Sequence, residues 1–117
     1  EISDPDGIVS ISSNQFTLGA GTYLIYWECP AYRPGRHQSR LYDVTGAAEV
    51  EKGMTRYDEN TAQTSGISPG SAVVSPTANN TYEIQHYGKV TKTTNGFGVE
   101  ANISYERYTR VTIWKVA

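Results

Sequence analysis

Polar side chains alternate with small or apolar ones through the middle of the chain, which reads Arg36-His37-Gln38-Ser39-Arg40-Leu41-Tyr42-Asp43-Val44. Successive side chains of a strand point to opposite faces. This places Arg36, Gln38 and Arg40 on one face and His37, Ser39 and Leu41 on the other. Long polar side chains need water or a partner, so we expect the face that carries Leu41 to lie in the core. The alternation predicts a strand with a polar outer face.

Strand-forming residues also dominate the rest of the chain. Val, Ile, Thr and Tyr are abundant, and runs of the strong helix formers are missing. Turn residues separate runs of strand length, and the predicted strands cover residues 8–12, 14–18, 21–29, 36–45, 47–54, 71–76, 80–90, 96–103 and 106–116. The polar stretch 58–70 is predicted to be a long surface loop. This spacing favours an all-β fold, a sandwich or a barrel.

Two of the predicted strands carry apolar side chains at both parities, in residues 23–27 and 111–116. A strand has this composition when both of its faces are covered. The chain has 117 residues, enough for one domain with a single core but not for two domains. We therefore expect the second apolar face to contact another subunit. In the run 81–87, alternation predicts that Tyr82, Ile84 and His86 point inward.

Charge and hydropathy exclude two classes of partner. The formal net charge is −2 and the pI is about 5.6, whereas nucleic-acid-binding domains usually have a pI above ~9. No apolar run reaches the ~18 residues that span a bilayer, and no signal peptide is recognisable. We expect no nucleic-acid partner and no membrane insertion. The single cysteine, Cys29, cannot form an internal disulfide.

Candidate catalytic and metal-binding residues are few, and each has a simpler structural interpretation. No nucleophile motif or metal-binding helix is present, so we predict no catalytic residue, no metal and no cofactor. Cys29 ends a predicted strand, where an inert thiol is favoured over a nucleophile. His37 and His86 are either a base or metal pair or, as we favour, core histidines. The segment 4–7 reads as a turn rather than as a calcium loop.

The tyrosines separate into two groups by their sequence context. Those within predicted strands, Tyr23, Tyr26, Tyr42 and Tyr82, are expected to pack in the core or between subunits. Loop residues more often carry binding, and an aromatic plane beside polar groups suits a sugar ring. We therefore predict a ligand-binding surface where two loops meet at one end of the fold. Its residues are Tyr32, Arg33, Arg56, Tyr57 and Asp58.

Four segments carry a resemblance to a known family. The strand-turn-strand segment 16–26 resembles the entry of C1q/TNF-like jelly-roll domains. A closer similarity is to C-terminal domains of bacteriophage tail fibres and tailspikes, in the segments 21–23, 36–42, 91–98 and 113–115, in the family's order. Two segments are this chain's own. Tyr87-Gly88 stands where family members often carry Arg-Cys, and 105–108 is rich in Tyr.

The resemblance implies a homotrimeric jelly-roll β-sandwich, C1q/TNF-like, spanning 1–117 as the C-terminal fragment of a longer fibre or tailspike chain. It implies a location on the virion, at a fibre or spike tip, and binding to host-surface glycan such as lipopolysaccharide or capsule. The alternative is a structural trimerisation cap without a ligand, with any glycan hydrolase outside this fragment. We expect the trimer interface to include Arg36, Gln38, Arg40 and Trp114.

Two further expectations concern particular contacts. The arginines of the polar strand face need carboxylate or carbonyl partners, and the acidic residues on other predicted strands are Glu83, Glu100 and Glu106. The loop 91–98 is expected to be structural, with a tight turn at Asn95-Gly96 and a buried Phe97 that anchors it.

Overall fold

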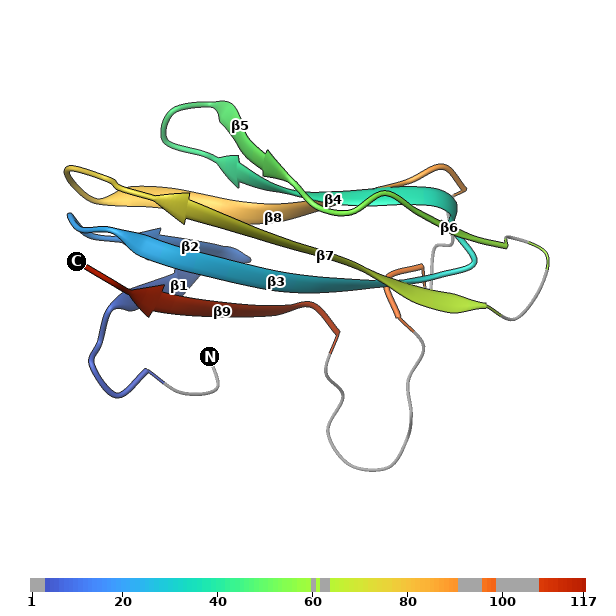
Figure 1. The fold of residues 1–117 in the computed structure, drawn as a ribbon, viewed down its shortest axis with the longest axis horizontal. Coiled ribbons are helices and arrows are strands. Elements are labelled where there is room, and N and C mark those ends of the chain that lie inside the picture. The colour runs from blue at the N-terminus through green and yellow to red at the C-terminus, as the bar shows by residue number, and fades with distance from the viewer. Residues whose placement is uncertain (1–3, 60, 62–63, 91–95, 99–107) are drawn as a thin grey trace.

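The computed structural model describes residues 4–59, 61, 64–90, 96–98 and 108–117. These residues form nine β-strands and, within the described ranges, no helix (Figure 1). The strands are β1 (Val9–Ser12), β2 (Gln15–Leu18), β3 (Tyr23–Tyr32), β4 (Gly35–Asp43), β5 (Ala48–Lys52), β6 (Arg56–Asp58), β7 (Ser65–Val74), β8 (Asn80–Gly88) and β9 (Arg110–Lys115). The prediction of an all-β fold is confirmed. The described part of the chain contains no helix long and apolar enough to cross a membrane.

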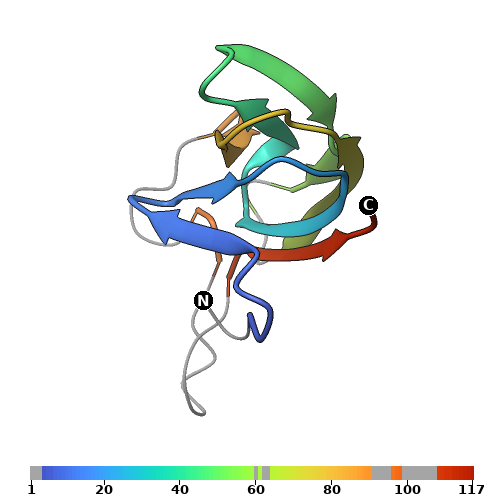
Figure 2. The same ribbon diagram turned by 90° about the vertical axis from the view of Figure 1, so that its left-hand side faces the viewer.

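The strands form two antiparallel sheets. One has six strands in the order β1-β2-β8-β4-β5, with β6 also paired to β4, and the other has three in the order β7-β3-β9. Viewed from one end, the strands surround a common interior, as in a β-sandwich (Figure 2). Strands distant in sequence are neighbours in both sheets, for example β2 beside β8 and β3 beside β9.

The core forms where the inward faces of the two sheets meet. From β3, Tyr23, Ile25 and Trp27 are buried, and Leu41 of β4 faces them. The buried hydrophobic cluster comprises Phe16, Leu18, Tyr23, Ile25, Trp27, Cys29, Leu41, Val74 and Tyr82. His37 and Ser39 are buried as well, so the inward face predicted for residues 36–44 is confirmed.

A buried polar link joins the two sheets at the centre of the core. The indole Nε1 of Trp27 donates to Oγ of Ser39, at 2.8 Å. Ser39 Oγ in turn donates to the backbone oxygen of Ser68 in β7, and Ser68 Oγ donates to the backbone oxygen of Met54. Because buried donors without acceptors are costly, this chain of hydrogen bonds accounts for small hydroxyl side chains at positions 39 and 68.

The sequence-based assignments are wrong in three places. The predicted loop 58–70 contains most of β7, which pairs with β3 over ten residues from Tyr32↔Ser65 to Tyr23↔Val74. Packing accounts for Gly70 in this strand, because a Cβ there would overlap the indole of Trp27. β6 was also missed. Of the predicted strand 96–103, residues 96 and 97 form a turn, and 99–103 lie outside the described residues.

The outer face of the three-stranded sheet carries a row of exposed apolar side chains, next to polar residues such as Ser71 and Thr112. Leu24 of β3 is directly opposite Val73 of β7 and Trp114 of β9. These three side chains are 37%, 64% and 49% exposed, and Tyr26 on the same face is 37% exposed. The two-sided apolar pattern thus corresponds to one buried face and one open face. We call Leu24, Val73 and Trp114 the apolar row.

Candidate functional site

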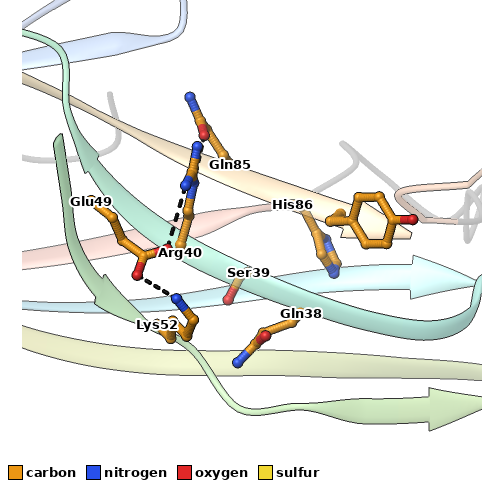
Figure 3. A pocket seen from close by; sticks show the side chains of 8 residues that line it. Gln38, Ser39, Arg40, Glu49, Lys52, Gln85 and His86 are labelled. Atoms are coloured by element: carbon orange, nitrogen blue, oxygen red, sulfur yellow. Dashed lines mark hydrogen bonds and ion pairs between the residues drawn. The ribbon is translucent and has the colours of Figure 1, made fainter. Parts of the chain in front are cut away.

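An open cleft of about 480 Å³ lies on the polar outer face of the six-stranded sheet (Figure 3). The strands β4, β5 and β8 supply its lining, which consists of Gln38, Ser39, Arg40, Glu49, Lys52, Gln85, His86 and Tyr87. The register places Gln38 opposite Tyr87 and Arg40 opposite Gln85. Cross-strand pairing therefore brings two separate polar segments together as one surface.

Hydrogen bonds hold the polar side chains of the cleft in place. Arg40 Nε donates to Gln85 Oε1 at 2.7 Å, and Gln85 Nε2 donates to Glu83 Oε1 at 2.8 Å. On its other side, Arg40 Nη1 lies 3.4 Å from Glu49 Oε1, and Lys52 Nζ lies 2.5 Å from Glu49 Oε2. Figure 3 shows Glu49 between the two cations. These polar side chains are already ordered without a ligand, which lowers the entropic cost of binding.

The residues that line the cleft carry a net positive charge. The hydrogen bond from Lys52, followed by that from Arg40, holds the pKa of Glu49 below its ordinary value, so its carboxylate is charged near neutral pH. One carboxylate faces two cations, which leaves one positive charge in excess among the lining residues. Burial, followed by the field of His37, lowers the pKa of His86 to about 4, so His86 adds no charge at neutral pH.

Tyr87 supplies an aromatic plane beside these polar groups. Its side chain is 71% exposed. Its cross-strand partner Gln38 donates from Nε2 to the backbone oxygen of Gly53, at 2.9 Å. Arg40 is held by a second aromatic residue, because its guanidinium lies 4.9 Å from the ring centre of Tyr42. An exposed ring next to fixed amide and guanidinium groups can stack on a sugar while those groups bind its hydroxyls.

A buried chain of ionisable side chains lies behind this face. His37 Nε2 is 2.6 Å from Asp58 Oδ2, and His37 Nδ1 is 2.8 Å from His86 Nε2. Arg56 Nε donates to the same carboxylate at 3.2 Å. His37 is 2% exposed and Asp58 is 6% exposed. These contacts link β6, β4 and β8. We call Arg56, Asp58, His37 and His86 the buried relay.

The proton positions in the buried relay follow from its charges. Burial opposes ionisation of Asp58, but hydrogen bonds from His37 and Arg56 outweigh it, so the pKa of Asp58 lies below its ordinary value. The ionised carboxylate accepts from His37 Nε2–H, and His37 Nδ1 and His86 Nε2 share one hydrogen bond. His86 Nδ1 is a buried atom without a hydrogen-bond partner in the described part of the chain. The His37 ring is satisfied, as predicted for a core histidine.

The structure also places the other residues considered for catalysis and metal binding. Burial is the main cause that raises the pKa of the Cys29 thiol to about 11, so this buried residue is protonated and a poor nucleophile, as the sequence predicted. Among the described residues, no group of three or more His, Cys, Asp or Glu could hold a metal ion. The predicted turn at 4–7 is confirmed, because Gly7 N donates to Asp4 O, and the Asp4 carboxylate accepts from Ile8 and Val9.

The loop surface predicted to bind ligand is assembled at one end of the sandwich. β6 pairs with the start of β4, with Arg36 opposite Tyr57, and Arg33 N donates to Thr64 O. Tyr57 is 60% exposed, and the Arg33 guanidinium lies 5.7 Å from the ring centre of Tyr32. Four of the five residues are not in loops as predicted, because Tyr32 ends β3 and Arg56, Tyr57 and Asp58 form β6. Their role in binding stays a prediction.

Asp58 does not have the position predicted for it. We expected its carboxylate on the exposed loop surface, but it points inward and is occupied by His37 and Arg56. The reason is the short strand β6, which the sequence did not indicate and which turns Asp58 toward β4. Arg56 keeps a side chain that is 48% exposed.

The residues predicted for a trimer interface lie on two opposite faces. Arg36, Gln38 and Arg40 are on the outer face of the six-stranded sheet, whereas Trp114 belongs to the apolar row of the three-stranded sheet. The carboxylate beside Arg40 is Glu49 rather than Glu83, which accepts from Gln85 instead. Glu100 and Glu106 lie outside the described residues.

The sequence-based prediction missed four cleft residues: Glu49, Lys52, Gln85 and Tyr87. The outward parity of Gln85 and Tyr87 in the run 80–90 was a usable signal. Gln85 and Tyr87 reach the cleft only because this run pairs with residues 36–44. The register of that pairing is not visible in the sequence. Nor does sequence alone show that β5 folds back beside Arg40.

The chain was also compared with known proteins. No protein-family model matches it, and no curated protein shows significant similarity to it.

Proposed function

We propose that this chain is a receptor-binding domain of a phage tail fibre or tailspike, which trimerises and binds host-surface carbohydrate such as lipopolysaccharide or capsule. The observation that carries this proposal is the cleft on the six-stranded sheet. There the exposed Tyr87 lies beside Gln38, Gln85 and Arg40, whose side chains are fixed by hydrogen bonds. In this proposal the domain acts by binding and performs no catalysis.

Two features of the cleft favour a sugar over an apolar small molecule. Its lining consists mainly of long polar side chains, whereas pockets for drug-like molecules are predominantly apolar. It is also open rather than enclosed, so it does not limit the ligand to a single sugar residue. Planar amide and guanidinium groups pair with the adjacent hydroxyls of a sugar, and the Tyr87 ring covers its C–H face.

A jelly-roll topology and a trimer complete the proposal. Sheet neighbours that are distant in sequence, such as β2 with β8 and β3 with β9, are what Greek-key connections produce. The apolar row supports assembly, because it exposes Leu24, Val73 and Trp114 side by side. If copies contacted each other through two opposite faces of the sandwich, they would stack in a line rather than close around a three-fold axis. We therefore assign Trp114 to the trimer contact, and Gln38 and Arg40 to the ligand.

The second candidate function is a trimerisation cap that binds nothing. The apolar row favours it, since assembly alone would account for that face. In this case the cleft would be a solvated polar face without a ligand. The loop surface around Tyr32 and Tyr57 is a second possible location for receptor binding.

The test compares two exposed tyrosines in binding to host cells and to their extracted surface polysaccharide. We expect Tyr87→Ala to abolish binding and Tyr57→Ala to leave it intact, with unchanged melting temperature and mass for both. Loss of binding in Tyr57→Ala alone would move the site to the loop surface. Absence of binding by the unmodified chain, across hosts whose polysaccharides differ, would favour the cap.

A further inference from the structure

The charge of the cleft indicates which class of carbohydrate it binds. This inference rests on the proposed carbohydrate binding. The whole chain is acidic, with a net charge of −2, yet the cleft carries two cations against the single carboxylate of Glu49. A locally positive surface on a negatively charged chain favours an anion. We infer that the cleft recognises an acidic polysaccharide, and that a carboxylate of a uronic-acid residue binds Arg40.

Arg40 has the donors and the orientation for this role. Within the described part of the chain, Gln85 accepts from Nε and Glu49 from Nη1, which leaves the second terminal amino group, Nη2, for a ligand. The Arg40 side chain is 41% exposed. Gln85 and the Tyr42 ring restrict how the guanidinium plane can turn. A planar guanidinium in a fixed orientation suits the two oxygens of a carboxylate.

Binding of a second carboxylate would balance the charges of the lining residues, which are Arg40, Lys52 and Glu49. The neighbouring carboxylate of Glu83 lies outside the lining, where it accepts from Gln85. The Arg40 Nη1 to Glu49 contact is long, at 3.4 Å, and both side chains are partly exposed. Pairs of this kind contribute little to stability, so a ligand carboxylate can displace it. Glu49 would keep its shorter contact with Lys52, at 2.5 Å. A neutral sugar would leave the excess positive charge uncompensated.

The distance between Tyr87 and Arg40 suits a sugar ring with its carboxylate. Arg40 is opposite Gln85, and Tyr87 is two residues further along β8, so Arg40 and Tyr87 are diagonal neighbours. Such pairs have Cα atoms roughly 7–8 Å apart. A pyranose ring stacked on Tyr87 can therefore direct a carboxylate on its C5 carbon toward Arg40.

The test uses two polymers that share a backbone and differ in charge. Polygalacturonate carries one carboxylate per residue, and its fully methyl-esterified form is neutral. We expect the chain to bind polygalacturonate more tightly, with an affinity that falls as salt is raised. Arg40→Gln should weaken that binding about tenfold, or about 1.4 kcal/mol, and weaken binding to the ester much less, because the ester offers Arg40 hydroxyls but no carboxylate. Arg36→Gln, on the same strand face but outside the cleft lining, should change neither.

The outcomes separate this inference from the proposed function. Tyr87-dependent binding that is equal for both polymers, or stronger for the ester, would overturn the inference and leave carbohydrate recognition standing. Binding to hyaluronan and alginate, two other uronate polymers, should show the same dependence on Arg40. Failure to bind any of the three uronate polymers, in a chain that binds host polysaccharide, would also overturn the inference. Failure to bind host polysaccharide at all would instead remove the proposed function.

Discussion

His86 shows at the residue scale how burial makes stability depend on pH. Its pKa is lowered from 6.5 to about 4 by burial, followed by the field of His37. The unfolded chain therefore takes up a proton at a higher pH than the folded chain does. The stability that neutral His86 contributes is present above about pH 6.5 and is lost as the pH falls toward 4. Asp58, whose pKa is lowered from 3.8, adds a loss in the same direction at still lower pH.

We expect the free energy of unfolding to decrease between pH 6.5 and pH 4. The measurement is denaturant unfolding at intervals across this range. His86→Leu removes the titrating group, so its stability should fall less steeply over the same interval. The dependence on His86 would be disproved if the variant and the unmodified chain lost stability in parallel.

Gly70 shows how a single missing side chain shapes the core. A Cβ at this position would overlap the Trp27 ring, whereas one at Gly19 would meet only Asn79 Oδ1, at 3.5 Å. We expect Gly70→Ala to destabilise the domain by about 1–3 kcal/mol or more, as overpacking does. Gly19→Ala serves as the control and should change stability little. Thermal denaturation followed by tryptophan fluorescence measures both, and equal melting temperatures would contradict this packing.

At the scale of elements, the short strand β6 is tied to β4 by the buried relay rather than by its length. It has three residues, and Asp58 is the carboxylate that His37 and Arg56 share. Removing one partner of a buried ion pair leaves the other without compensation, which typically costs about 3–5 kcal/mol. The residue that sequence suggested for a ligand therefore has a structural role in the fold.

We expect Asp58→Ala to lower the free energy of unfolding by several kcal/mol, with about 3 as the low end of the range for buried pairs. Tyr57→Ala, at the adjacent and exposed position, should change it by less than ~0.5 kcal/mol. Urea unfolding of both variants provides the comparison. Equal, small effects would mean that the relay does not hold β6.

The loop that follows β8 also differs from expectation at this scale. Phe97 was expected to be buried, but it is 58% exposed and lies with its ring centre 5.4 Å from that of His86. It partly covers one end of the relay instead of filling the core. Gly98 meets the expected close approach, since it has a φ of 141° and a Cβ there would overlap Tyr108. Residues 91–95 of this loop lie outside the described residues.

At the scale of the whole molecule, the two outer faces differ in chemistry. One face carries the polar cleft with Arg40 and Tyr87, and the other carries the apolar row. This asymmetry suits a domain that uses one face for assembly and the other for a ligand. A trimer built on the apolar row would leave three cleft copies facing outward, and multiple copies raise the avidity for a repeating polymer.

We expect light scattering to give the mass of three chains at micromolar concentration. Trp114→Lys places a charge in the apolar row and should reduce the mass to that of one chain. Arg40→Met alters the cleft and should leave the mass unchanged. A monomeric unmodified chain would contradict the trimer, and dissociation by Arg40→Met alone would place the interface on the polar face.

The sequence by itself determined the strand class and much of the inward face. Alternation in residues 36–44 identified His37, Ser39 and Leu41 as buried, because the two-residue period of a strand depends only on local backbone geometry. Only the tertiary structure decided which strands are neighbours and in what register. The cleft depends on Arg40 lying opposite Gln85, and the buried relay depends on β6 pairing with β4. Both result from long-range pairing, which the packing of the whole core selects and which no local pattern encodes.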